Sequence, residues 1–200
     1  MPEVDGSREA ESRLKAAIVA MFESDPLVFQ KSGFAKKLAD VLAVDLADMH
    51  LAAFLGLAEA AGLAIDGAKV AQIAKDWAIG YSRDLAKELA KTMRERWAGF
   101  QERIAEEVES DWRKAWIVLI TSAAAAIAAT EITRAIIRGE RDLSRMSKRL
   151  GAGEVAAFWL SERDGRVCPE CAKRDGKRIT REWPPLHVVC RCRVKWVWVP

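Results

Sequence analysis

The sequence predicts a mainly α-helical fold, an elongated helical bundle followed by a small C-terminal module with a β-hairpin. Through most of the first 150 residues, apolar side chains recur every three or four positions, which is the period of an amphipathic helix. After Gly153 this period gives way to β-branched and aromatic residues bounded by turn-forming pairs. We therefore expect a helical body over residues 1–150 and a small module over residues 151–200.

The composition suits a folded protein with a substantial core. Of the 200 residues, 50% are hydrophobic and 30% are charged, and the formal net charge is +3. Basic residues gather from Thr133 onward, a pattern that fits nucleic acid or an acidic protein surface, and equally a solvated mixed surface. DNA contact through the basic C-terminal third is therefore left open.

We recognise no targeting or membrane-spanning signal in the helical body. Met1–Asp5 lacks the basic start and apolar stretch of a signal peptide. The most apolar segment, Ala115–Ala129, is shorter than the roughly 20 residues needed to cross a bilayer. We expect no membrane partner and cysteines that begin in the reduced state.

The helices of the body are separated by proline and glycine positions. A first helix is expected to begin near Ser7 and to end at Asp25-Pro26, and a second begins at Phe34. A third, long helix starts at Ala68, after the turn at Asp66-Gly67. Its apolar stripe is typical of a bundle core and consists of Val70, Ile73, Trp77, Tyr81, Leu85, Leu89, Met93 and Trp97.

A fourth, largely buried helix is expected over Trp112–Ile137. Gly139 then breaks the apolar pattern, so a short polar helix over Arg141–Leu150 should follow separately. His50 lies in an Ala- and Leu-rich segment without a partner motif, and we interpret it as a core residue and not as a ligand.

All four cysteines and one of the two histidines fall in one short stretch, at Cys168, Cys171, His187, Cys190 and Cys192. Thiolates and a neutral imidazole are the ligands that a tetrahedral Zn²⁺ prefers. A loop between Cys171 and His187 would bring the second group back to the first. We predict a structural Zn²⁺ site formed by four of these five residues, and hence a zinc-stapled module; a disulfide or idle buried thiols are the alternatives.

The spacing does not decide which four residues bind the ion. Cys168 and Cys171 are the firmest pair. His187 and Cys190 repeat the three-residue spacing of that pair, whereas Cys190 and Cys192 would share one face of an extended strand. The residue left out would be a neighbouring group or a spare thiol.

A catalytic role is not expected for this zinc. Catalytic zinc keeps one coordination position open and needs a nearby general base. The chain has neither a His-x-Glu element nor a His-Glu-x-x-His pair, and His50 is followed by Leu51 and Ala52. We expect no catalytic residue and no small-molecule substrate.

Three motifs, in order, resemble the phage Mu F-like family of minor head, or head-morphogenesis, proteins of tailed bacteriophages. Ile127–Ala135 is similar to the family's IA-x-TE-x-x-RA segment. Phe158–Lys177 is similar to its block with D-x-R-x-C-x-x-C and DGK, and Pro184–Cys192 to its PP-x-H-x-x-CRC ending. The resemblance covers about Trp112 to Val194, and Val188-Val189 replaces the usual Pro-Asn type pair.

The resemblance implies a low-copy virion component that is associated with the portal and assists head assembly, genome packaging or delivery. Its partners would be phage portal and head proteins, in the virion and, during assembly, in the host bacterial cytoplasm. It further implies that Glu131 fixes the docking of the zinc module by pairing with Arg191, or with Arg166. The alternative for Glu131 is an ordinary helix-surface pair with Arg134 or Arg138.

Two other functions are kept as alternatives to the structural one. A zinc-dependent nucleic-acid-processing enzyme would need an open metal position and His or carboxylate bases. A zinc-ribbon DNA-binding protein is favoured by the basic C-terminal end alone.

Overall fold

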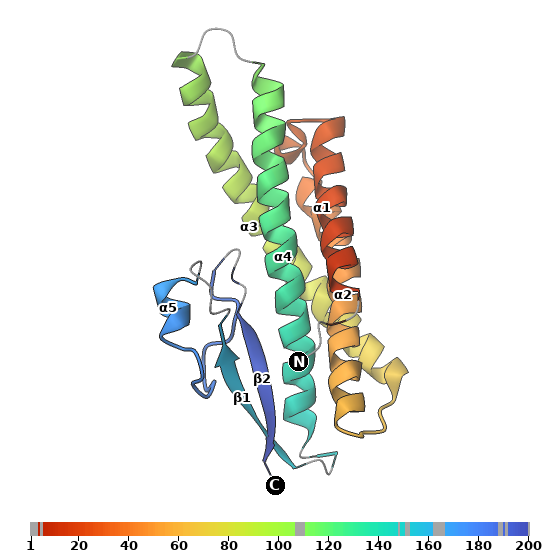
Figure 1. Cartoon of the computed structure of the whole chain (residues 1–200). Helices are drawn as coiled ribbons and strands as arrows, with labels where there is room; N and C mark the ends of the chain where they lie inside the picture. The colour runs from red at the N-terminus through yellow and green to blue at the C-terminus, as the bar shows by residue number, and fades with distance from the viewer. Residues whose placement is uncertain are drawn as a thin grey trace.

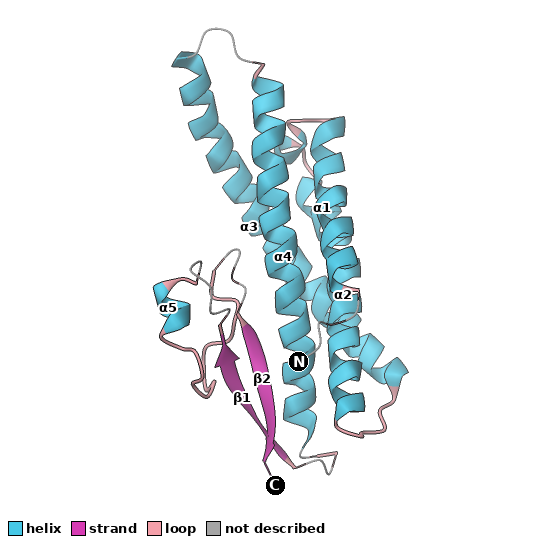
Figure 2. Ribbon diagram, viewed as in Figure 1, coloured by secondary structure: helices cyan, strands magenta, loops and turns pink. Residues whose placement is uncertain are grey.

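The computed structural model describes residues 4, 6–106, 111–147, 149–150, 153–161, 167–187, 190 and 192–199. Figure 1 shows an elongated body of helices with a small β module beside it, which confirms the predicted fold class, and Figure 2 shows the strands confined to that module. The elements are α1 (Ser7–Ser24), the 3-10 helix η1 (Val28–Gln30), α2 (Phe34–Ala60), α3 (Gly67–Glu106), α4 (Trp112–Ser147), β1 (Glu154–Leu160), α5 (Pro169–Ala172) and β2 (Arg193–Val199).

The helix α2 is central, because α1, α3 and α4 all pack against it. At one end of the body, an aromatic cluster joins the elements. The ring of Trp116 lies 5.7 Å from that of Phe29 and 4.9 Å from that of Trp97. The Trp116 indole also donates a hydrogen bond of 2.9 Å to the carbonyl oxygen of Pro26, so this buried polar group is satisfied.

The apolar stripe of α3 is arranged differently from the expected core. Most of its large side chains, such as Trp77 and Leu85, are only half-buried. The fully buried row consists of small residues at four-residue spacing: Ala74, Ala78, Ser82, Ala86 and Ala90. Small side chains let two helices approach closely, so the large residues flank the contact and leave part of their surface exposed.

The predicted end of a helix at Gly139 is wrong, because α4 continues through this residue to Ser147. A Cβ atom at Gly139 would overlap the carbonyl oxygen of His50 and would lie 3.1 Å from the amide nitrogen of Phe54. The backbones of α2 and α4 therefore approach each other closely at Gly139. The same glycine that interrupts the apolar pattern permits the packing of the two helices.

The β module is built on the antiparallel pair β1 and β2, in which Glu154 lies opposite Val199 and Leu160 opposite Arg193. The predicted turn at Asp175-Gly176 is present, and Gly176 has a φ of 73°, which favours glycine. This turn does not join the two strands. It returns the chain to the other edge of β1, where the Gly176 amide donates to the Trp159 carbonyl at 2.8 Å.

The module docks on α4 through an apolar layer and one polar contact. Ala157 and Trp196 are buried together with Phe54 and Leu143 of the body. The Trp196 indole donates a hydrogen bond of 2.8 Å to the carboxylate of Glu140. Burial of this inner face explains why so short a pair of strands can be stable against the helices.

By length and composition alone, α2 and α4 are each able to cross a membrane. The Ala115–Ala129 segment is only part of the longer α4, so the length of this segment understated how long the apolar helix is. Within the most apolar window of each helix, 50% of the α2 residues and 39% of the α4 residues are buried inside the molecule. A core helix of a water-soluble protein passes the same test, so the absence of a membrane partner stays a prediction.

The close approach at Gly139 gives a first testable prediction. Gly139→Ala should destabilise the protein by more than about 3 kcal/mol, because the added methyl group meets backbone atoms that cannot rotate away. The matched control is Gly80→Ala in α3, where a Cβ would meet no atom within 4 Å. There the higher helix propensity of alanine should add about 0.5–1 kcal/mol. Urea unfolding measures both, and equal effects would contradict the assignment.

Candidate metal centre

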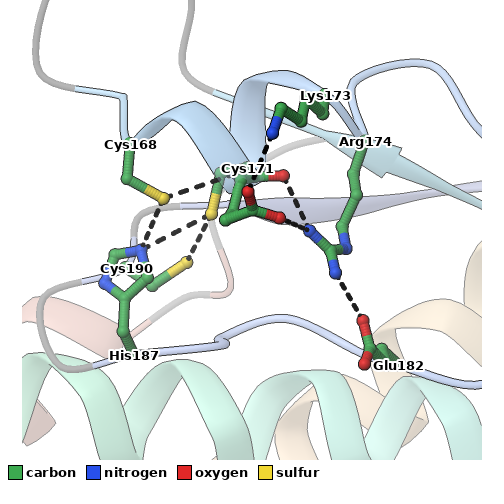
Figure 3. Close-up of polar contacts among 8 residues, drawn as sticks. Cys168, Cys171, Lys173, Arg174, Glu182, His187 and Cys190 are labelled. Carbon is green, nitrogen blue, oxygen red and sulfur yellow. Dashed lines mark hydrogen bonds and ion pairs between the residues drawn. The ribbon is translucent and has the colours of Figure 1, made fainter.

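The first pair of thiols is positioned by the short helix α5. Cys168 caps this helix, and its Sγ accepts a hydrogen bond of 3.3 Å from the amide of Cys171. Pro169 follows at the first helical position, where its missing N–H costs nothing. Figure 3 shows the two side chains directed toward the same space, together with His187 and Cys190.

The distances between the ligand atoms fit a four-coordinate metal ion. The His187 Nε2 atom lies 3.1 Å from Cys168 Sγ and 3.5 Å from Cys171 Sγ. Cys171 Sγ lies 3.7 Å from Cys190 Sγ. Metal bonds of about 2.3 Å to sulfur and about 2.0 Å to nitrogen at tetrahedral angles place two sulfur atoms about 3.8 Å apart, and sulfur and nitrogen about 3.5 Å apart. This cluster could therefore bind a metal ion.

The ligand atoms form two overlapping trios, each within 4.8 Å. One contains Cys168, Cys171 and His187 and reaches the surface, and the other contains Cys171, Cys190 and Cys192 and is buried. Cys171 is shared by both trios, so a single ion would include it. Both ligand sets expected from the spacing remain open, one with His187 and one with Cys192.

The thiols of the cluster differ in how easily they lose a proton. The hydrogen bond from the Cys171 amide lowers the pKa of the Cys168 thiol to about 7. Burial instead raises the pKa of Cys171 and of Cys192. Buried thiolates therefore need a nearby cation, and a bound metal ion provides that charge.

A buried indole covers the inner side of the cluster. Trp159 is 2% exposed and packs against Cys171, Cys190 and Cys192. Its Nε1 atom has no hydrogen-bond partner at regular distance among the described residues. Burial raises the pKa of Cys192, but the Trp159 indole opposes that increase.

Glu131 lies in a polar network within the helical body. It is 4% exposed and accepts hydrogen bonds from the Tyr81 hydroxyl at 2.7 Å and from Arg134 at 2.6 Å. The pair with Arg134 on the same helix is thus present, but Glu131 is buried in it and does not lie on the helix surface as that alternative expected. Arg191 and Arg166 lie outside the described residues, so the docking pair with Glu131 stays a prediction.

Arg134 completes this network, because it also donates a hydrogen bond of 3.0 Å to the Tyr81 hydroxyl oxygen. Burial lowers the pKa of Arg134, whereas the neighbouring Glu131 raises it above its usual range. The guanidinium thus neutralises the buried Glu131 carboxylate.

His50 is a core residue, as expected. It is 0% exposed, its ring lies 5.0 Å from that of Trp77 in a tilted arrangement, and it belongs to neither trio. Burial lowers its pKa to about 4, so the imidazole is neutral near pH 7. Its Nε2 lies 3.5 Å from an oxygen of Asp142.

Sequence reasoning missed the contact between Glu140 and Trp196. These residues are separated by 56 positions, and Glu140 lies in a charged run that reads as solvent-exposed. Burial raises the pKa of Glu140 to about 7, and the hydrogen bond from Trp196 lowers it only in part. No local spacing identifies such a pair.

No protein-family model matches the chain, and neither a curated protein nor a solved structure matches it. The resemblance to the phage Mu F-like proteins therefore rests on the motif residues themselves.

Substitution of single ligands should decide the ligand set. Cys171→Ser should remove the metal, because Cys171 belongs to both trios. His187→Ala and Cys192→Ser should differ in metal content, since only one of these two side chains is needed to complete four-coordination. Elemental analysis of the purified variants gives the answer, and Lys195→Ala, on the exposed side of β2, is the control. Full metal content in Cys171→Ser would contradict the conclusion that a single ion includes Cys171 among its ligands.

The raised pKa of Glu140 predicts a pH-dependent stability. The unfolded chain loses this proton near pH 4.5, whereas the folded protein keeps it until about pH 7. Stability should therefore fall as the pH rises through this window. Glu140→Gln, which keeps an acceptor for Trp196, should stabilise the protein at pH 8 by at most about 3 kcal/mol.

The gain from Glu140→Gln should shrink to near zero at pH 5. Thermal unfolding of the variant and the parent protein at both pH values measures the difference, and titration of the thiols cancels in the comparison. A gain of the same size at both pH values would show that Glu140 is not the responsible group.

Proposed function

We propose that the protein is a structural minor head protein of a tailed bacteriophage or prophage, in which a zinc site holds the C-terminal module in shape against the helical body. In this role it binds the portal and neighbouring head proteins and assists head assembly, genome packaging or delivery. It acts in the host bacterial cytoplasm during assembly and in the virion afterwards. The portal as partner rests on the resemblance of the three motifs.

Zinc is the metal that the donor set favours. Thiolates select soft ions, and a mixture of cysteine and histidine at tetrahedral separations suits Zn²⁺ better than Mg²⁺ or Ca²⁺, which prefer oxygen ligands. Such a small module gains much of its folding energy from the bound ion.

The single observation that favours a structural over a catalytic metal is the position of Glu170. This is the acidic residue of the Cys-x-x-Cys motif, and in sequence it is the carboxylate nearest to the candidate ligands. Its carboxylate binds Lys173 at 3.0 Å and Arg174 at 3.1 Å. These pairs lower the pKa of Glu170, so it is a poor proton acceptor.

The helical body offers apolar area for a protein partner. Val44 of α2 and Val118 of α4 are each 63% exposed, and the large residues of the α3 stripe are only half-buried. Apolar side chains on rigid helices are suitable for a stable protein interface. This supports a binding role for the body while the metal module supplies a preset second surface.

The proposal predicts that the chain copurifies with the portal from infected or induced cells. Its removal should reduce correctly assembled heads or infectivity. Purified heads are examined by mass spectrometry, and a strain with the gene deleted is compared with its complemented parent. Cys171→Ser serves as the matched variant, since it should disrupt the module while the helical body stays folded.

Purified heads that lack the chain, together with normal infectivity after deletion, would refute the structural role. The enzymatic alternative is tested separately. The metal-loaded protein should not hydrolyse or deaminate DNA, RNA or nucleotides above background. Turnover that disappears on Glu170→Gln while the metal is retained would favour the enzyme.

A further inference from the structure

The segment that follows α5 forms an open groove on the outside of the metal module. The groove has a volume of about 360 Å³. Trp159 and Ile179 contribute its apolar part, and the cations Arg174, Lys177, Arg178 and Arg181 line it together with one carboxylate, that of Glu182. The function proposed above does not use this concentration of positive charge.

The cations of the groove are only partly neutralised. Arg174 is held by Glu170 and by Glu182, the latter at 2.6 Å. Arg178 pairs with Glu154 at 2.9 Å, but both side chains are more than half exposed, and such a surface pair contributes little. Within the part of the chain that the structure describes, Lys177 and Arg181 have no ion-pair partner. The groove therefore presents an excess of positive charge.

The groove is part of the folded framework of the module. The Trp159 amide donates to the Lys177 carbonyl at 2.8 Å, and the Ile179 amide donates to the Ala157 carbonyl at 2.7 Å. Trp159 and Ile179 also pack against the cysteine cluster. Lys177 and Arg181 are consequently carried on a backbone that β1 and the metal centre hold in place.

We propose that this groove binds the phosphodiester backbone of nucleic acid without reading its sequence. From Lys177 to Arg181 the chain spans at most about 14 Å. One strand of DNA carries a phosphate about every 3.4 Å along the helix axis. A segment of this length can therefore face several neighbouring phosphates at once, which favours a regular polyanion over a single small anion.

The rest of the groove indicates how the nucleic acid is bound. Trp159 is buried, so it offers no open ring face on which a base could stack. Thr180 is exposed and can donate its hydroxyl to a phosphate oxygen. Ile179 is only half-exposed, and a membrane would require larger apolar groups at the rim. Contacts to the backbone alone give affinity that is independent of sequence and sensitive to salt.

The test uses the metal-loaded full chain and fluorescein-labelled duplex DNA of mixed sequence. Fluorescence anisotropy across a series of salt concentrations should show binding that weakens steeply with salt. The double variant Lys177→Ala/Arg181→Ala should lower the affinity near 0.1 M salt on the order of tenfold to hundredfold and reduce the salt slope by about two. The control Lys36→Ala/Lys37→Ala, on exposed positions of α2, should leave both quantities unchanged.

A second measurement does not depend on how well the variants fold. DNA should protect Lys177 of the unaltered protein from acetylation, as measured by mass spectrometry, while Lys69 and Lys75 of α3 stay reactive. No binding at low salt, equal loss in the control variant, or an unprotected Lys177 would overturn the proposal. Tighter binding of poly-glutamate than of DNA would instead assign the groove to an acidic protein. The proposal does not depend on the head-assembly role, so the result of this experiment leaves that role untouched.

Discussion

The C-terminal module depends on the convergence of sulfur atoms around Cys171. Its Sγ lies 3.7 Å from Cys190 Sγ and 3.5 Å from the His187 ring, and most of these groups are shielded from water. Bringing such groups together without a cation is unfavourable for thiolates, which repel one another, and gives neutral thiols only weak hydrogen bonds. A bound metal ion would supply the missing positive charge and would crosslink these side chains. The helix α5 and the residue before β2 carry Cys171 and Cys192 to this point.

The helix α4 transmits this constraint to the rest of the molecule. Near its middle, Glu131 and Arg134 bind Tyr81 of α3. Further along, Glu140 accepts the indole N–H of β2. Between them, Gly139 fixes how closely α2 approaches. One helix therefore sets the spacing of the body on one side and the position of the module on the other, and the two cannot shift independently.

The sequence predicted the parts of this structure that depend on local periodicity or on residue chemistry. The helix starts at Ser7, Phe34 and Trp112 were correct, because capping, proline and apolar spacing act over a few residues. The cysteine cluster was predicted because few other uses explain such a gathering of ligands. The role of Gly139 was misjudged, since a glycine that ends a helix and one that admits a neighbouring backbone look alike in a single chain. Glu140 was missed because its partner is distant in sequence and no local rule connects a charged residue with a far tryptophan.

The register of β1 and β2 has a consequence for the order in which the protein folds. Glu154 pairs with Val199, so β1 cannot complete its pairing with β2 until the last residues of the module have left the ribosome. The helices contact one another within earlier parts of the chain and can assemble during synthesis. The module therefore folds last, onto a helical surface that has already formed. Under the proposed function, capture of the metal ion would be the step that completes the molecule. A cell poor in that ion would then accumulate chains with a folded body and an unfolded C-terminal segment.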